Sequence, residues 1–180
     1  MTPGLAIHLV VEGTTGRVVL LCHPDLSDPD PAATWSRGIT LLAVDPAQPG
    51  RCGADDLAEE LDQRAAGPVG AIGWSAGGLV ALTLAARHPG LVDRLVVIGA
   101  PSPDAEPDPG FEPSQITAKT LLLYGAKDPI AGPRDGKWYQ QRLPNARFEQ
   151  VPGEGRLLVA PMWRRALSHL APNHRRIAAG

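Results

Sequence analysis

Short apolar runs alternate with amphipathic stretches along the chain. Runs such as Val18–Cys22 and Val69–Trp74 are rich in aliphatic residues and contain almost no polar position, which is typical of strands that are covered on both faces. This alternation predicts an α/β fold with a mostly parallel central sheet and helices on both faces. The predicted strands are Leu5–Val11, Val18–Cys22, Ile39–Asp45, Val69–Trp74, Leu95–Gly99, Thr120–Gly125 and Arg147–Val151.

Helical periodicity appears between these strands. Asp55–Ala65 places apolar residues at i, i+1, i+4 and i+8, which fall on one face of a helix. Gly77–His88 and Pro161–Leu170 predict two further helices. Pro101–Pro113 differs from all of these, because it holds five prolines and four acidic residues. Proline fixes φ and lacks an N–H, so this stretch is predicted to be a loop or a flexible flap.

Length and charge narrow the classes of function. The 180 residues suit a single domain, spanning residues 1–180, with a substantial core. Lysine and arginine number 17 against 19 acidic residues, and this net charge of −2 predicts no nucleic-acid partner and no polybasic contact with a membrane. No apolar run approaches the roughly 20 residues of a membrane span, and the N-terminal segment does not have the pattern of a secretory signal.

The two cysteines, Cys22 and Cys52, lack the spacing of metal ligands and are too few for a disulfide scaffold. We therefore expect a cytoplasmic protein. The sequence has no G-x-x-x-x-G-K-[ST] run and no cluster of His and Cys, so we expect neither a cofactor nor a metal. The 20 glycines and 19 prolines fall mostly in the connections between the predicted elements, where they favour turns.

The most informative motif is GWSAG at residues 73–77, between a predicted strand and a predicted helix. Its G-x-S-x-G spacing places small residues two positions either side of Ser75, which allows a sharp turn from strand to helix. Ser75 would then lie exposed above the sheet, at the positive end of the following helix. In this strand-turn-helix context, the motif indicates a nucleophilic serine.

With this motif, the chain resembles the α/β-hydrolase superfamily over nearly its whole length. VVLLCHPD at residues 18–25 resembles the family's strand that ends in His-Gly, and residues 35–45 resemble its next helix and strand. PGRCGADDLAEEL at 49–61 resembles the turn and helix before the serine, and ARHPGLVDRLVVIGAP at 86–101 resembles the link to the next strand. The strand that precedes the acid of the triad resembles residues 120–130, TLLLYGAKDPI. The segment that carries the family's catalytic histidine resembles residues 151–170, VPGEGRLLVAPMWRRALSHL.

The resemblance implies a role for several residues. Ser75 would be the nucleophile and Asp128 the acid, with the backbone N–H groups of Ala76 and Asp25 forming the oxyanion hole. His23 and Trp74 lie beside these positions and are candidates for substrate binding or an auxiliary role. The substrate would be a small-molecule or carrier-bound ester, thioester or lactone.

Two positions depart from the family pattern. Arg156 stands where the family has its catalytic histidine, and arginine keeps its proton above about pH 12, so it cannot act as a base. Without a base, a serine hydroxyl is a poor nucleophile at neutral pH. Pro24 replaces the usual glycine after His23, and Asp25 adds a carboxylate beside the expected oxyanion hole. Both departures weaken the case for ordinary Ser-His-Asp hydrolysis.

Two other residues are candidates for the base. His23 lies in the predicted oxyanion loop, and Glu154 could reach the site if its loop folds differently. Arg156 itself has two interpretations. It could form an ion pair with Asp128 that locks two loops together, or it could bind a substrate carboxylate, phosphate or enolate while Ser75 and the oxyanion donors hold the other end.

The family usually inserts a helical cap after the strand that follows the serine helix. Here only residues 100–119 separate the two predicted strands, so we expect no cap and an open pocket. Three functions are consistent with these features. The first is an acyl hydrolase acting through Ser75. The second is a non-hydrolytic enzyme, such as a cyclase, isomerase or lyase, that uses Ser75 and Arg156 to position its substrate. The third is a catalytically silent pseudohydrolase that binds a ligand or a partner.

Overall fold

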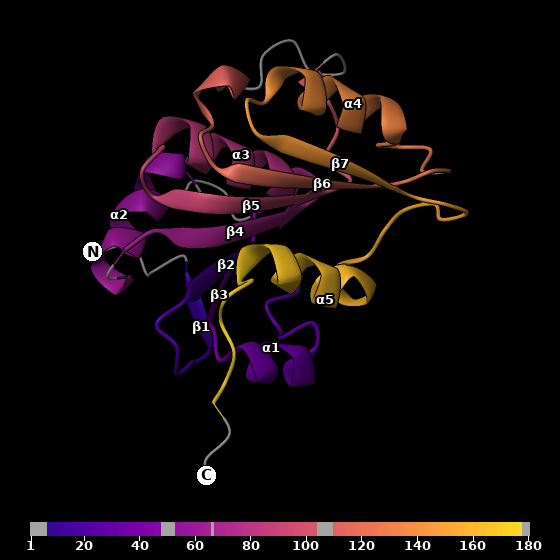
Figure 1. Cartoon of the computed structure of the whole chain (residues 1–180). Coiled ribbons are helices and arrows are strands. Elements are labelled where there is room, and N and C mark those ends of the chain that lie inside the picture. The colour runs from indigo at the N-terminus through magenta and orange to yellow at the C-terminus, as the bar shows by residue number, and fades with distance from the viewer. Residues whose placement is uncertain (1–6, 48–52, 66, 104–109, 178–180) are drawn as a thin grey trace.

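A seven-stranded sheet forms the middle of the computed structural model, which describes residues 7–47, 53–65, 67–103 and 110–177 (Figure 1). The strand order is β1-β3-β2-β4-β5-β6-β7, and every neighbouring pair is parallel except β1 with β3. The strands are β1 (His8–Val11), β2 (Val18–Cys22), β3 (Thr40–Val44), β4 (Val69–Trp74), β5 (Val92–Ile98), β6 (Lys119–Gly125) and β7 (Ala146–Val151).

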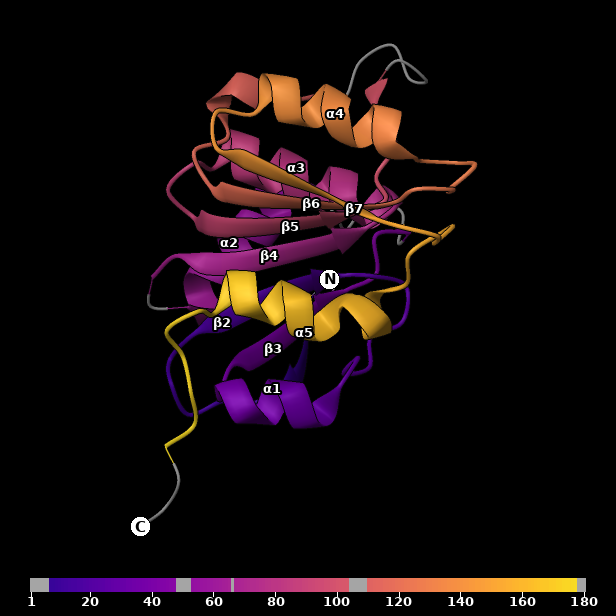
Figure 2. The same cartoon turned by 45° about the vertical axis from the view of Figure 1, so that its right-hand side comes forward.

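Helices cover both faces of this sheet and bury an apolar core on each. Figure 2 shows α1 and α5 on one face and α2, α3 and α4 on the other. One core cluster lies between the sheet and α2, α3 and α4, and the second lies between the sheet and α1 and α5. The α/β fold class predicted from the alternation is therefore confirmed. The helices are α1 (Pro31–Arg37), α2 (Ala54–Arg64), α3 (Ala76–Arg87), α4 (Pro133–Arg142) and α5 (Val159–Leu170).

The predicted strands agree with the observed ones to within a few residues. One difference is at β5, which begins at Val92 where the prediction began at Leu95. Asp93 and Arg94 are polar, so the apolar pattern hid the exposed start of this strand. Residues 5 and 6 of the first predicted strand lie outside the described residues, as does Cys52, whereas Cys22 is buried at the end of β2.

The sequence did not predict α4. This helix has Pro133 at its first turn, where proline is well tolerated, and Gly136 in its interior, where glycine disfavours a helix when it is judged by propensity alone. The structure explains the glycine, because a Cβ at Gly136 would lie 2.3 Å from Cε2 of Phe148 on β7. Only a residue without a side chain lets α4 pack this closely on the sheet.

The connection from β5 to β6 is short. Residues 99–103 and 110–118 of this connection are described, and they include a 3₁₀ turn at Pro113–Gln115. These described residues form no cap domain. The middle of the predicted loop Pro101–Pro113 lies outside the described residues, so its mobility stays a prediction. Within the described part of the chain, no helix has the length and apolar character needed to cross a membrane.

The parallel arrangement determines where the site forms. The strands β2, β4, β5, β6 and β7 all point the same way, so their carboxyl ends meet at one edge of the sheet. In open α/β sheets this is the edge where ligands bind. The loops after β2, β4, β6 and β7 carry His23, Ser75, Asp128 and Arg156 respectively.

Candidate active site at the carboxyl edge of the sheet

Ser75 occupies a strained turn between β4 and α3. Its backbone has φ 54° and ψ −119°, and it is the single non-glycine residue with positive φ in the described ranges. Such a conformation is costly for a residue with a side chain, and it persists where surrounding contacts enforce it. Here the Ser75 N–H donates to the carbonyl of Ile98 at 2.9 Å, and the Ser75 carbonyl accepts from the Gly78 N–H at 2.9 Å. The hydroxyl is held at the carboxyl edge, partly exposed.

The two outer glycines of the motif make this turn sterically feasible. A Cβ at Gly73 would lie 2.1 Å from the carbonyl oxygen of Gly77, and a Cβ at Gly77 would lie 2.1 Å from the carbonyl oxygen of Cys22. Both contacts are with backbone atoms, which cannot turn aside as a side chain can. The first turn of α3 therefore packs directly on the ends of β2 and β4, and any larger residue would push Ser75 out of place.

Arg156 contacts Ser75 directly. Its Nη2 donates a hydrogen bond to Ser75 Oγ at 3.0 Å. The guanidinium also stacks on Trp74, with Cζ 4.5 Å from the ring centroid, an arrangement that cation–π attraction favours. The indole N–H of Trp74 donates to the carbonyl of Leu157 at 2.7 Å, which anchors the loop that carries Arg156. The group beside the serine oxygen is thus a fixed cation that can donate protons in hydrogen bonds and cannot accept one.

Asp128 is buried and does not pair with Arg156. Its Oδ1 accepts from the N–H groups of Ile130 at 2.8 Å and Ala131 at 3.2 Å, within its own loop. Its Oδ2 is buried and has no hydrogen-bond partner in the described structure, and the same is true of Nη1 of Arg156. No ion pair joins the two side chains, both of which belong to the described residues. The interpretation of Arg156 as a partner of Asp128 is therefore wrong.

His23 interacts with its own loop. Its Nδ1 accepts from the N–H of Asp25 at 2.9 Å, and its ring lies 5.1 Å from the ring of Trp74, centroid to centroid. This corrects one expectation, because the Asp25 N–H that was expected to bind an oxyanion is already engaged by His23. The carboxyl of Asp25 accepts from Ser27, and hydrogen bonds from Ser27 lower its pKa, which favours a negative charge there.

Of the remaining candidates, Ala76 has a backbone donor available beside Ser75, and Glu154 forms no hydrogen bond with Ser75 in the described structure. Ala76 is the first residue of α3, so its N–H has no acceptor within the helix, and the residue is exposed. This donor is free to bind an oxyanion beside Ser75. Glu154 is exposed, and its backbone carbonyl accepts from the N–H of Lys127 at 2.8 Å. No hydrogen bond between the Glu154 carboxylate and Ser75 occurs in this part of the structure, so the geometry does not place Glu154 as a base.

A small cavity next to His23 was not predicted from the sequence. Its volume is about 180 Å³, and its lining includes Pro29, Leu158 and Val159. Leu158 is a large apolar side chain that is 57% exposed. The sequence carries only a weak signal for this cavity, because the apolar pair 158–159 looks like the ordinary start of α5.

Among the described residues there is no group of three or more His, Cys, Asp or Glu side chains that could hold a metal ion.

Comparisons with known proteins point to one fold. A family model described as alpha/beta hydrolase fold matches residues 54–115, which include Ser75. Carboxylesterase CesB from Bacillus subtilis aligns with a TM-score of 0.72 and 19% identity, over 93% of this chain and 88% of that one. Naproxen esterase from Bacillus subtilis aligns with a TM-score of 0.69 and 15% identity, over 89% and 86%. A hydrolase from Pseudomonas aeruginosa aligns with a TM-score of 0.69 and 14% identity, over 90% and 92%. A search of curated protein sequences finds no match.

Proposed function

We propose that this chain, which has the α/β-hydrolase fold, is a hydrolase-family enzyme that acts on an ester, thioester or lactone at Ser75, with an incomplete triad. The observation that carries this proposal is the conformation of Ser75, with φ 54° directly between β4 and α3. A strained turn of this kind presents the serine oxygen to a substrate above the sheet. Backbone strain of this kind is concentrated at functional sites, so it supports a functional role for Ser75.

In the proposed reaction, Ser75 Oγ attacks the acyl carbon and the carbonyl oxygen becomes an oxyanion. The free N–H of Ala76 supports this oxyanion at one side. The Asp25 N–H is engaged by His23, so the guanidinium of Arg156 is the second donor within reach of the reacting atoms. Arg156 thus stabilises negative charge in the proposal, although it cannot receive the serine proton.

The missing base sets the expected rate. With no histidine at position 156, the proton of Ser75 has to pass to solvent, and the buried Oδ2 of Asp128 has no imidazole to orient. Hydrolases that lose one triad member keep roughly 10³- to 10⁴-fold acceleration over water through the oxyanion hole and binding. We therefore expect slow turnover, well below that of a complete triad.

A cavity beside His23 supports a substrate with a short acyl group. It has a volume of about 180 Å³ and is lined in part by apolar side chains, and although Ser75 is not among its lining residues, the ring of His23 lies next to that of Trp74, the residue before Ser75. The absence of a cap in the described part of the β5–β6 connection leaves the entrance open. An acyl group on a bulky alcohol, or on a carrier, would therefore fit better than a fully enclosed small molecule.

A labelling experiment tests the proposal. A fluorophosphonate probe should label the parent chain slowly and should not label Ser75→Ala, while a chromogenic short-chain ester should be hydrolysed with the same dependence on Ser75. Ser114→Ala removes an exposed serine near Pro113 and serves as the matched control. Equal labelling and equal hydrolysis in the parent and in Ser75→Ala would refute a serine mechanism.

One observation favours a second candidate, a non-hydrolytic enzyme on the same fold. The hydrogen bond from Arg156 to Ser75 makes a pair of donors that could hold a carboxylate or an enolate. In that case the probe would leave Ser75 unlabelled, and both Ser75→Ala and Arg156→Gln would weaken binding of a small dicarboxylate. Absence of both labelling and dicarboxylate binding would instead favour the pseudohydrolase.

A further inference from the structure

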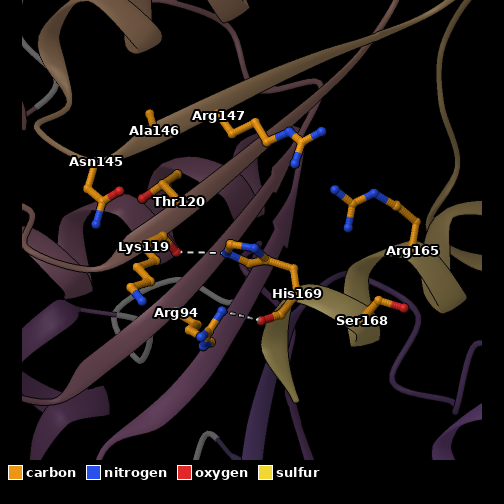
Figure 3. Close-up of a pocket in the computed structure, with 9 residues that line it drawn as sticks. All are labelled: Arg94, Lys119, Thr120, Asn145, Ala146, Arg147, Arg165, Ser168 and His169. Atoms are coloured by element: carbon orange, nitrogen blue, oxygen red, sulfur yellow. Dashed lines mark hydrogen bonds between the residues drawn. The ribbon is translucent and has the colours of Figure 1, made fainter. Parts of the chain in front are cut away.

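A second cavity lies at the opposite edge of the sheet from Ser75, where β5, β6 and β7 begin and α5 ends (Figure 3). Its volume is about 360 Å³, which is within the range of small-molecule sites, roughly 300 to 1,000 Å³. None of the residues assigned to the Ser75 site lines it. The side chains that give it its chemical character are those of Arg94, Lys119, Arg147, Arg165 and His169.

This cavity concentrates positive charge. Four of its lining residues are lysine or arginine, and they come from three strands and one helix. The acidic partner that meets them is Glu149, which accepts from Nε of Arg165 at 3.0 Å and lies 3.3 Å from Nε of Arg147. One carboxylate against four cations leaves a local charge of +3, in a chain whose net charge is −2.

Two of the cations have no carboxylate partner among the described residues. Arg94 donates from Nη1 to the backbone carbonyl of His169 at 3.0 Å, which fixes its side chain without neutralising it. Lys119 forms no ion pair within the described ranges, and its backbone carbonyl meets Nε2 of His169 at 2.8 Å. Figure 3 shows both hydrogen bonds and the side chains of Arg147 and Arg165 that lie on the other side of the cavity.

The lowered pKa of His169 is a second indication that positive charge is concentrated at this cavity. Burial lowers the pKa of its imidazole, and Arg94 and Arg165 lower that pKa further by charge repulsion. The carbonyl of Lys119 can only accept, so Nε2 of His169 carries a hydrogen and the ring is held in one orientation. The imidazole is thus fixed against the wall of the cavity, among cations that no further described carboxylate neutralises.

We propose that this cavity binds a phosphate group, either free or carried by a small phosphorylated molecule. A phosphate carries close to two charges and offers several acceptor oxygens, so it can engage cations from several elements at once. A single carboxylate would neutralise about one of the three surplus charges. Arginine also offers planar paired donors that match phosphate oxygens. Nε and Nη2 of Arg165 already donate to Glu149, which holds that guanidinium in place, so the paired donors available to phosphate are those of Arg94 and Arg147. The proposal does not depend on Ser75.

Calorimetric titration of the full chain with inorganic phosphate and with glycerol 3-phosphate tests this site. Both probes should give saturable binding, and Lys119→Gln should weaken it about tenfold, which is the scale of one charge-assisted contact. The Lys119 backbone carbonyl survives this change, so the contact with His169 is retained. Lys137→Gln on α4 removes an exposed lysine far from the cavity and is the matched control, expected to bind as the parent does.

The two probes distinguish the two sources of phosphate. Tighter binding of glycerol 3-phosphate supports a phosphorylated small molecule, and equal binding supports free phosphate. Arg147→Gln provides a second variant if Lys119→Gln unfolds, since Arg147 is 77% exposed at its side chain. The proposal is overturned by the absence of saturable binding at millimolar probe, by an equal loss in Lys137→Gln, or by a loss in Ser75→Ala, which would place the binding at the other edge.

Discussion

The two edges of the sheet carry opposite kinds of site. At the carboxyl edge, a strained backbone presents one serine, and a single side chain, Arg156, determines what that serine can do. At the amino edge, the backbone is ordinary and four cations share one cavity. The first site has polar atoms without partners, Oδ2 of Asp128 and Nη1 of Arg156. In the second, surplus charge is spread over several side chains.

This difference has a physical consequence for substitution. A preformed backbone site depends on one group being of the right chemical type, so one change can alter its activity by orders of magnitude. A cluster of charges acts through the sum of its members, so each change has a smaller effect. The carboxyl edge should therefore respond sharply to single substitutions, and the amino edge should respond in small steps.

The largest effect is expected from Arg156→His. An imidazole in place of the guanidinium could accept the proton of Ser75, and Oδ2 of Asp128 would be free to accept its other N–H. General-base catalysis contributes typically 10²- to 10⁴-fold. We expect kcat/KM for a chromogenic acetate ester to rise by about a hundredfold, the lower end, because the Asp25 N–H remains engaged by His23 and the change also removes the guanidinium proposed as the second oxyanion donor.

Two controls isolate the base from the loss of the cation. Arg156→Gln removes the guanidinium without adding a base, so it should not gain activity. The double variant Ser75→Ala/Arg156→His should return to the rate of Ser75→Ala. If Arg156→Gln gained as much as Arg156→His, the native arginine would be an obstacle to substrate, and the comparison between the two edges would lose its chemical basis.

A backbone contact beneath Arg156 should give the next largest effect. A Cβ at Gly125 would lie 1.7 Å from the carbonyl oxygen of Gly155 and 2.8 Å from that of Glu154. Gly125→Ala must therefore push the loop that carries Arg156 away from β6. Overpacking of this kind costs about 1 to 3 kcal/mol in the free energy of unfolding, which denaturant titration with far-UV circular dichroism measures.

Gly67→Ala is the matched control, because a Cβ there meets nothing within 4 Å. It should change the free energy of unfolding by no more than about 0.5 kcal/mol. Phosphate binding at the amino edge should be the same in both variants, since the displaced loop lies at the other end of the strands. A Gly125→Ala chain as stable as Gly67→Ala would show that the 154–156 loop yields freely, contrary to the anchoring described above.

The elements that the sequence predicted well are those that depend on neighbours in the chain. Apolar runs gave the buried strands, and the G-x-S-x-G spacing of 73–77 predicted the strand-turn-helix in which Ser75 lies. The helix α4 was missed because Gly136 is chosen for contact with Phe148, a residue on another element. Local propensity carries no information about that contact.

The partners within the site were harder to predict for the same reason. The sequence identified Arg156 as the residue at the position of the catalytic histidine. Its contact with Ser75 was not predictable, because it joins residues 81 positions apart and the guanidinium is placed by stacking on the Trp74 ring. The engagement of Asp25 by His23 depends on a ring orientation that no pattern encodes. The cavity at the amino edge was not predicted at all, because its cations are scattered from Arg94 to Arg165 and converge only through the order β5-β6-β7.

The smallest expected effect concerns His169 at the amino edge and acts through pH. The pKa of this imidazole is lowered in the folded chain, first by burial and then by Arg94 and Arg165, against an ordinary value of 6.5. As pH falls below about 6.5, the unfolded chain therefore takes up the proton before the folded chain does. The stability of the fold should fall from there, until the lower folded-state pKa has been passed.

His169→Gln should remove part of this decline. Its amide can still donate to the carbonyl of Lys119, as Nε2 of the imidazole does, but it does not titrate. Thermal melts between about pH 7 and pH 5 should show a smaller loss of Tm than in the parent. His8→Gln, at an exposed position on β1, controls for the loss of a histidine. Added inorganic phosphate should reduce the parent's decline, because an anion in the cavity favours the imidazolium of the folded chain. A parent whose decline is unaffected by phosphate would separate His169 from the proposed ligand.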